Sequence, residues 1–405
     1  MPQKKPCLFV VSPFVDKRHG TERRVAEWLT RLSDTFQIHL YSQRVEDLDL
    51  SRINWHRIPK LPGPHLLSYL WWFLANHLWR IWDCRIRRIC PDMIFSPGIN
   101  CLDADVMSVH IVFAEYRVQN EMSLRFSAHS IGIWPVILHR KLYYNLLMFL
   151  ERRLYCDKSR SLILISRRTS TALRTFYGRR EPLPVIYLGL DHHIFSTETR
   201  RRLRNAARRD LGLLSNQFVL LLIGNDWRNK GLGCLLEALA QLRDLPIYVL
   251  VVGQDDSSSY RKLIQRNECA RQIEFLSPRK DVEFLYAAAD AYVGPSQEDT
   301  FALPPAEAMA CGLPVITSTT NGTSEIIQDG IDGLLLRNPS DSNELASLIR
   351  KLYESSSLRE RMGAKAAEKM LQFSWERNGR EMTDLLLQVL EAKKSGHASA
   401  VRQEA

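Results

Sequence analysis

The stretch EDTFALPPAEAMACGLPVITS, residues 298–318, contains an acidic pair at its start, a double proline, a further Glu and a short apolar run. Because proline is favoured in the first turn of a helix, Pro304 and Pro305 predict that a helix begins there, and Gly312 predicts its end. The apolar run after Gly312 predicts a buried strand. A loop that leads into a helix and then a strand is typical of a doubly wound α/β domain.

The same alternation of strands and helices continues on both sides of this stretch. The predicted strands are 7–12, 36–42, 93–96, 106–112, 162–166 and 185–187 in the first half, and 218–224, 247–253, 273–276, 291–293 and 315–317 in the second. The sequence therefore predicts two Rossmann-like domains, 1–190 and 191–375, that face a central cleft. A basic linker running into a short helix is predicted at 197–209, a final helix at 376–392 packing on the first domain, and a disordered tail at 393–405.

Charge is distributed unevenly along the chain. The net charge is +10 over 405 residues, and residues 1–190 hold 28 Lys or Arg against 16 Asp or Glu, a balance of +12. This balance fits an anionic partner, either nucleic acid or a membrane surface, and fits a solvated basic surface equally well. The eight cysteines form no CxxC pair, which is typical of reduced thiols in the cytosol. The apolar run at the N-terminus is broken by Pro13 and is better interpreted as a strand than as a signal peptide.

The carboxylates Asp299 and Glu307 lie on either side of the double proline. The free N–H groups at the predicted helix start favour a phosphate. A carboxylate beside such a site suits a vicinal diol of a ribose or a hexose, because an ionised carboxylate only accepts hydrogen bonds.

The block 298–316 resembles the signature of the retaining glycosyltransferases of family 4, the glycosyl transferases group 1, which have the GT-B fold of two Rossmann-like domains. Further matches follow in the expected order: HGTER at 19–23, His110 after a predicted strand, GNDWRNKG at 224–231 and PSQED at 295–299. The motif GNDWRNKG is also similar to a motif of enzymes that build the lipopolysaccharide core. The resemblance extends over residues 7–390.

The resemblance implies a role for each matching residue. Glu307 would bind the nucleotide ribose, Asp299 or its neighbour Glu298 the donor sugar, Arg228 and Lys230 the diphosphate, Gly20 the diphosphate and acceptor side, and His110 the transferred sugar. Backbone groups of Thr300, Phe301, Ala302 and Leu303 would complete the donor site. Three positions depart from the family pattern. Asp299 is shorter than the usual Glu, and Ala302 replaces a Gly, so its backbone must avoid the left-handed region. LGLD at 188–191 replaces a more usual Asn-Gly-Val-Asp.

The implied reaction is transfer of a hexose from a nucleoside diphosphate, with UDP favoured over GDP, to a hydroxyl of a glycan or lipid-linked acceptor. Arg228 and Lys230 would stabilise the leaving diphosphate, so the resemblance implies retention without a metal or other cofactor. Two Asp-x-Asp tripeptides, 47–49 and 103–105, are of a kind that binds metals in other transferases, but such tripeptides occur often by chance.

Two segments of the first domain are rich in aromatic and basic residues. Residues 65–90 place Leu67, Trp71, Leu74, Leu78 and Trp82 in a helical stripe and end in clustered arginines, and residues 126–155 have a similar composition. They predict either an anionic membrane surface as partner or helices packed on the sheet. We expect a cytoplasmic protein, peripheral on the inner face of the membrane.

Other functions stay open at this point. One alternative is a sugar-nucleotide epimerase, which would share the fold. A phosphorylase of the same fold would need a pyridoxal lysine, and no lysine of this sequence lies in a recognisable motif of that kind. The basic first half would suit a nucleic-acid-binding protein, although no compact nucleic-acid motif supports one. The departures at Asp299 and Ala302 would also fit a binder without catalytic activity.

Overall fold

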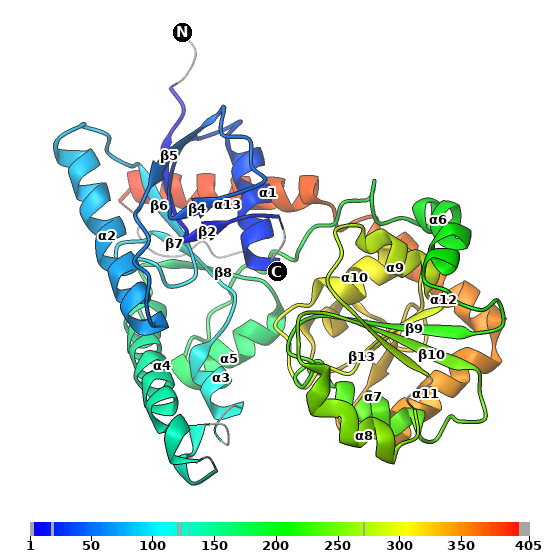
Figure 1. Ribbon diagram of the computed structural model, residues 1–405. Helices are drawn as coiled ribbons and strands as arrows, with labels where there is room; N and C mark the ends of the chain where they lie inside the picture. The colour runs from blue at the N-terminus through cyan, green and yellow to red at the C-terminus, as the bar shows by residue number, and fades with distance from the viewer. Residues whose placement is uncertain are drawn as a thin grey trace. The chain divides into compact units, whose positions relative to one another are not determined.

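The protein is described by a computed structural model that covers residues 4–17, 20–119, 121, 124–128, 130–269 and 272–396. It consists of two compact units (Figure 1). The first runs to Tyr187 and resumes at Glu376, and the second is Leu188–Trp375. The tail predicted from residue 393 lies, beyond Gly396, outside the described residues.

The first unit is built on a parallel sheet in the order β5-β3-β1-β6-β7-β8. Its strands are β1 (Cys7–Val11), β3 (Gln37–Ser42), β5 (Ile53–Arg57), β6 (Met93–Pro97), β7 (Val106–Val109) and β8 (Ser161–Leu164), and β2 (Phe14–Val15) pairs with β4 (Arg44–Val45) beside them. The chain reverses its direction of travel across the sheet after β5, at β1 and β6. This is the arrangement of a doubly wound domain, in which ligands bind at the carboxyl ends of the strands.

Alternate residues of β1 face two different helical layers. Leu8 and Val10 pack with α1 (Gly20–Leu32) and α13 (Trp375–Lys394), whereas Phe9 and Val11 pack with α2 (His65–Arg85) and α4 (Trp134–Tyr155). In Figure 1, α2 and α4 lie along one face of this sheet. The remaining helices of the unit are α3 (Phe113–Gln119) and α5 (Arg167–Tyr177), with two 3-10 turns at Phe126–Ala128 and Ile131–Ile133.

The second unit repeats this plan with the order β11-β10-β9-β12-β13-β14. The strands are β9 (Phe218–Ile223), β10 (Ile247–Val252), β11 (Ile273–Leu276), β12 (Ala291–Gly294), β13 (Val315–Ser318) and β14 (Leu334–Leu336). Helices α7 (Leu232–Leu239), α8 (Arg261–Arg266) and α11 (Ser342–Glu354) lie on one face, and α6 (Thr197–Asp210), α9 (Val282–Ala288) and α10 (Leu303–Ala310) lie on the other (Figure 1). Helix α12 (Ser356–Met370) follows α11, and 3-10 turns occupy Ser257–Tyr260 and Gly322–Ile326.

Helix α6 differs from the linker and short helix predicted at 197–209. It has 14 residues, and its arginines are used in packing. Arg204 and Arg208 both pair with Asp290 and donate to carbonyl groups at the end of α9, such as Ala287 O and Ala288 O. The basic residues therefore fix α6 against α9. Their polarity had suggested a solvated linker, because it gives no sign of these contacts.

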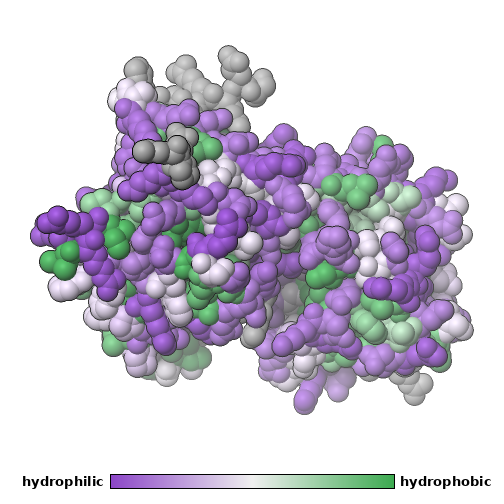
Figure 2. All heavy atoms as spheres, turned by 90° about the horizontal axis from the view of Figure 1, so that it is seen from above, coloured by the Kyte–Doolittle hydropathy of each residue, from purple (hydrophilic) through white to green (hydrophobic). Residues whose placement is uncertain are grey.

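No helix among the described residues is long and apolar enough to cross a membrane. The face drawn in Figure 2 is largely hydrophilic, and its apolar residues occur in small groups.

Candidate functional site

The turn between β9 and α7, residues 224–231, is shaped by glycines at both ends. Gly224 and Gly231 have φ of +148° and +77°, a region that favours glycine. A Cβ on Gly231 would lie 1.9 Å from the carbonyl oxygen of Pro295, and one on Gly224 would lie 2.6 Å from Lys230 Cε. The turn therefore packs directly on the loop that follows β12, and the aliphatic part of Lys230 crosses Gly224.

Hydrogen bonds in both directions join this turn to the loop after β12. Asn229 donates from Nδ2 to Glu298 O at 2.8 Å, and its carbonyl oxygen accepts from Gln297 N at 2.7 Å. Lys230 Nζ forms an ion pair with Asp299 Oδ2, and both side chains are mostly buried. Two residues that lie 69 positions apart in the sequence thus share one site. Arg228, in the same turn, is exposed.

Glu307 lies in the second turn of α10, which begins at Leu303 with the two prolines at its start, as predicted. Its side chain is buried, and Oε2 accepts a hydrogen bond from the Tyr286 hydroxyl at 2.7 Å. Tyr286 comes from α9, and sequence spacing had given no indication of it. Fixing the carboxylate from a neighbouring helix keeps it as a hydrogen-bond acceptor close to the start of α10.

The phenol of Tyr292, on β12, interacts electrostatically with both predicted carboxylates. Burial raises the pKa of its phenol, and the charges of Asp299 and Glu307 both add to that increase. Because Coulomb interactions weaken with distance, both carboxylates lie near the end of β12. Lys230 is the cationic partner of Asp299.

The start of α10 is held by Asn321, another residue that the sequence did not single out. Asn321 is buried, and its Oδ1 accepts from Ala302 N at 3.4 Å and from Thr323 N at 3.0 Å. Thr323 Oγ1 in turn donates to Ala302 O at 2.7 Å. Ala302 has φ −82° and ψ 131°, so its backbone avoids the left-handed region as its sequence requires. Its N–H is directed to Asn321, and its predicted part in the donor site stays a prediction.

The first unit places Gly20 and His110 at the carboxyl edge of its sheet. Gly20 is the first residue of α1, and His110 directly follows β7. The imidazole lies between two hydroxyls, with Nε2 2.8 Å from Ser108 Oγ and Nδ1 3.5 Å from Thr21 Oγ1. Burial and then the charge of Arg24 lower the pKa of His110 to about 3. The ring is therefore neutral at physiological pH. His19, the first residue of the HGTER motif, lies outside the described residues.

Arg24 is a buried cation beside this site that the sequence reasoning did not identify. Its Nη2 donates to Ile186 O at 2.7 Å, and the guanidinium lies over Trp28 at 5.0 Å from the ring centroid. Within the described part of the chain, its Nε and Nη1 have no hydrogen-bond partner. Burial lowers the pKa of Arg24 to about 9. A positive charge so placed favours anions and disfavours a protonated His110.

The second Asp-x-Asp tripeptide is used in structural contacts. Asp103 accepts from Arg80 at 2.6 Å, and Asp105 accepts from Ile94 N at 2.8 Å and pairs with Lys393 at 2.9 Å. The described residues contain no group of three or more His, Cys, Asp or Glu side chains arranged to hold a metal ion.

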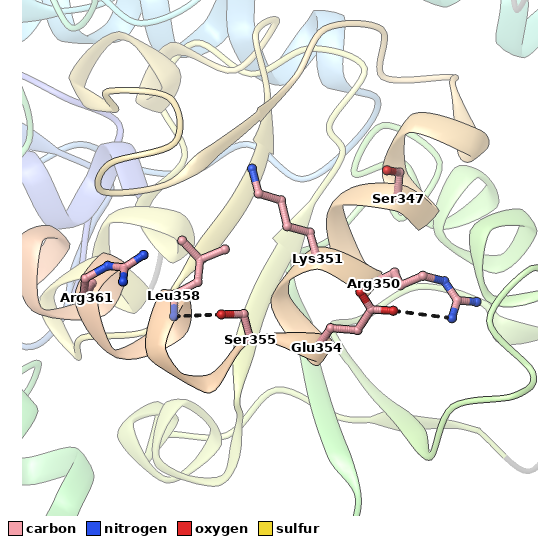
Figure 3. A pocket seen from close by; sticks show the side chains of 7 residues that line it. All are labelled: Ser347, Arg350, Lys351, Glu354, Ser355, Leu358 and Arg361. Carbon is pink, nitrogen blue, oxygen red and sulfur yellow. Dashed lines mark hydrogen bonds and ion pairs between the residues drawn. The ribbon is translucent and has the colours of Figure 1, made fainter.

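A shallow pocket of about 520 Å³ also lies where α11 meets α12. Figure 3 shows its lining, Ser347, Arg350, Lys351, Glu354, Ser355, Leu358 and Arg361. Ser355 caps α12 by accepting from Leu358 N at 3.2 Å, and Arg350 is held by Asp244 at 2.9 Å. These are surface and helix-end contacts, so we place no functional site here.

Comparison with known proteins relates the second unit to a known family. Residues 204–369 match the family model described as Glycosyl transferases group 1. The lipopolysaccharide glucosyltransferase WaaG of Escherichia coli (strain K12) is 31% identical over 159 residues, which are 38% of this chain and 42% of that protein. The aligned segments of the first curated relatives range from 42% to 70% of those proteins, and most are about half.

Solved structures extend the likeness to both units. The crystal structure of WaaG, a glycosyltransferase involved in lipopolysaccharide biosynthesis, has a TM-score of 0.75 at 20% identity and covers 93% of this chain and 99% of its own. The Anabaena protein HepE in complex with UDP-glucose has a TM-score of 0.68 at 21% identity, with coverage of 94% and 99%. The two parallel sheets and these neighbours confirm the predicted GT-B fold.

Proposed function

We propose that this chain, whose residues 204–369 match the family model of the glycosyl transferases group 1, is a retaining glycosyltransferase. It moves a hexose from a nucleoside diphosphate to a hydroxyl of a glycan or lipid-linked acceptor. The observation that carries the proposal is the grouping of Lys230, Asp299 and Glu307 at the carboxyl end of the second sheet, around the start of α10. This edge is where α/β sheets bind ligands.

The proposed chemistry divides the charges of the site between the two ends of the donor. Lys230 and Arg228 neutralise the diphosphate as its bond to the sugar breaks, Lys as a point charge and Arg as a fork of donors. Because Lys230 already reaches Asp299, a diphosphate that takes Lys230 leaves the Asp299 carboxylate to accept from sugar hydroxyls. Glu307, fixed by Tyr286, accepts from the ribose diol. No metal ion takes part in this scheme.

The first unit contributes the sugar and acceptor side of the proposal. Its His110 is a neutral imidazole, suited to hydrogen bonding with a neutral sugar, and Gly20 allows close approach at the start of α1. We propose UDP as the nucleotide. The neighbouring HepE structure, which holds UDP-glucose, supports this choice.

We further propose that the protein is cytoplasmic and peripheral on the inner face of the membrane. Helix α2 exposes a row of apolar side chains, Leu67, Leu70, Leu74 and Leu78, called the α2 row below. Arg85, Arg87 and Arg88 follow it in the chain. An exposed apolar row that ends in arginines suits an anionic membrane surface. A lipid-linked acceptor would then lie close to the enzyme.

The proposal is tested by titrating the purified protein with UDP, GDP and ADP, with Mg²⁺ or with a chelator, by calorimetry. We expect UDP to bind more tightly than the others and equally well without Mg²⁺. Glu307→Ala and Lys230→Ala should each weaken UDP binding by about tenfold or more, since each removes a charged hydrogen-bonding group.

Matched controls come from the pocket in Figure 3. Glu354→Ala and Lys351→Ala remove the same two side-chain types from the pocket between α11 and α12, and they should leave UDP binding unchanged. Binding that Glu307→Ala and Lys230→Ala leave intact would show that the nucleotide site is placed wrongly. Hydrolysis or transfer of the UDP-sugar that follows the same pattern would extend the assignment to the reaction.

A further inference from the structure

We propose that a pocket at the outer edge of the first sheet binds an anionic pyranose, meaning a sugar ring that carries a carboxylate or a phosphate. The pocket has a volume of about 520 Å³, within the range of small-ligand sites. It lies between the edge strand β5 and the second half of α2. Its lining is Trp55, His56, Arg57, Leu78, Trp79, Trp82, Asp83 and Arg87.

This pocket is separate from the site around His110. In the sheet order, β3, β1 and β6 lie between β5 and β7, the strand that leads to His110. At about 4.8 Å per strand, the two places are roughly 19 Å apart within the unit. The inference therefore does not rest on the proposed transfer reaction.

The walls of the pocket are three indole rings from two different elements. Trp79 and Trp82 of α2 are 37% and 57% exposed, which is unusual for side chains of this size. Trp55 of β5 is fixed by a hydrogen bond from Nε1 to Ser42 O at 3.3 Å. The negative face of an indole attracts the polarised C–H groups on the face of a pyranose. Such rings give a sugar a flat surface to pack on.

The floor of the pocket is a preorganised chain of polar groups. Asp83 is buried, and its Oδ2 accepts from the Tyr41 hydroxyl at 2.8 Å and lies 2.7 Å from His56 Nδ1. His56 Nε2 is 2.9 Å from His39 Nδ1. Burial lowers the pKa of both imidazoles, so neutral rings fit this chain, with each Nδ1–H donating to the next acceptor. A satisfied network of this kind holds the walls in place.

The rim of the pocket carries two guanidinium groups. Arg57 is exposed and lies 5.9 Å from the centroid of the Trp55 ring, and Arg87 is 3.2 Å from Asp83 Oδ1. Arginine forks suit carboxylate and phosphate oxygens. A purely apolar ligand would desolvate the exposed Arg57 without compensation, whereas a free anion would leave the indoles unused. A sugar ring with an anionic substituent uses both.

The test uses the full chain labelled with 5-fluorotryptophan, whose ¹⁹F resonances are assigned by single Trp→Phe changes. Glucuronic acid, glucose and inorganic phosphate are titrated separately. We expect glucuronic acid to shift the Trp79 and Trp82 resonances with a Kd of about 1 mM, as a half-open site allows. Glucose should bind at least about tenfold more weakly. The resonance of Trp134, a similarly exposed residue of α4, should not move.

Variants separate the two parts of the site. Trp82→Ala should weaken glucuronic acid binding at least about tenfold, and Arg57→Gln should remove the preference for glucuronic acid over glucose. The controls Trp134→Ala and Glu307→Ala should change neither the affinity for glucuronic acid nor this preference. Equal shifts from phosphate alone, or no shift from glucuronic acid, would overturn the proposal. Shifts produced by neutral lipid vesicles and by no sugar would also overturn it, in favour of a membrane contact. A parallel arm with a glucuronosyl lipid in the same vesicles shows whether the pocket takes the sugar more tightly when it is a lipid headgroup than when it is free.

Discussion

His39 belongs to a polar chain under the edge strands, and it makes the stability of the first unit depend on pH. Burial, and then the neighbouring His56, lower the pKa of His39 from 6.5 to about 4. Between these values the unfolded chain binds a proton that the folded chain excludes. The free energy of unfolding therefore falls as the pH drops from 6.5 towards 4, by about 2 kcal/mol at pH 5 for His39 alone.

Urea unfolding followed by tryptophan fluorescence at pH 7 and pH 5 measures this effect, since most of the tryptophans are in the first unit. His39→Gln removes the titrating group, so its stability should change less between the two pH values than that of the wild type. His65→Gln, which alters an exposed histidine, is the control and should behave as the wild type. An identical pH dependence in His39→Gln would contradict the assignment.

The α2 row shows what a single element contributes to the proposed location. Leu70 and Leu74 are 44% and 54% exposed. Replacing both with Gln should lower binding to vesicles that contain anionic lipid by about tenfold or more, because their apolar surface no longer leaves water. Binding of the wild type should also decrease with added salt, which screens the arginines after the helix.

Vesicle flotation measures this partitioning, and Leu214→Gln, an exposed leucine of the second unit, is the matched control. Wild type and double variant floating to the same extent would exclude the α2 row as the membrane contact. The elements themselves explain why the sequence left two alternatives for this segment. A helix that packs one side on a sheet and exposes the other carries apolar residues on both, and composition does not distinguish them.

Strands with long apolar runs were predicted close to their observed bounds, and strands without such runs were missed. Residues 218–224 were predicted as a strand, and β9 occupies Phe218–Ile223. By contrast, β5 reads INWHR, because an edge strand under a helix is only partly buried, and β14 has three residues. Val185, predicted to begin a strand, makes one isolated bridge to Leu164.

The candidate site shows the same division. The motif around the double proline placed Glu307 on its helix because that information is local. The pairing of Lys230 with Asp299, the support from Tyr286 and Asn321, and the burial of Arg24 depend on contacts between residues far apart in the chain. Their residue types are common on any surface, so spacing alone carries no signal for them.

At the scale of the whole molecule, the chain leaves the first unit and later returns to it, so the core of that unit is completed by residues near the C-terminus. Met382, Leu385 and Leu386 of α13 pack among strand residues such as Leu8 and Ile38. Leu386→Ala should therefore destabilise the first unit by about 2–5 kcal/mol through the cavity it leaves. The change should leave the second unit unaffected, although α13 directly follows it in the sequence.

Hydrogen–deuterium exchange measured by peptide distinguishes the two units. Leu386→Ala should speed exchange in β1 and β3, and exchange in β9 and β10 should stay as in the wild type. Leu345→Ala, which removes an equally buried leucine of α11 from the second core, should have the opposite pattern. Faster exchange in both sheets from either variant would mean that the units unfold as one cooperative body, because destabilising one core would then lower the protection of the other.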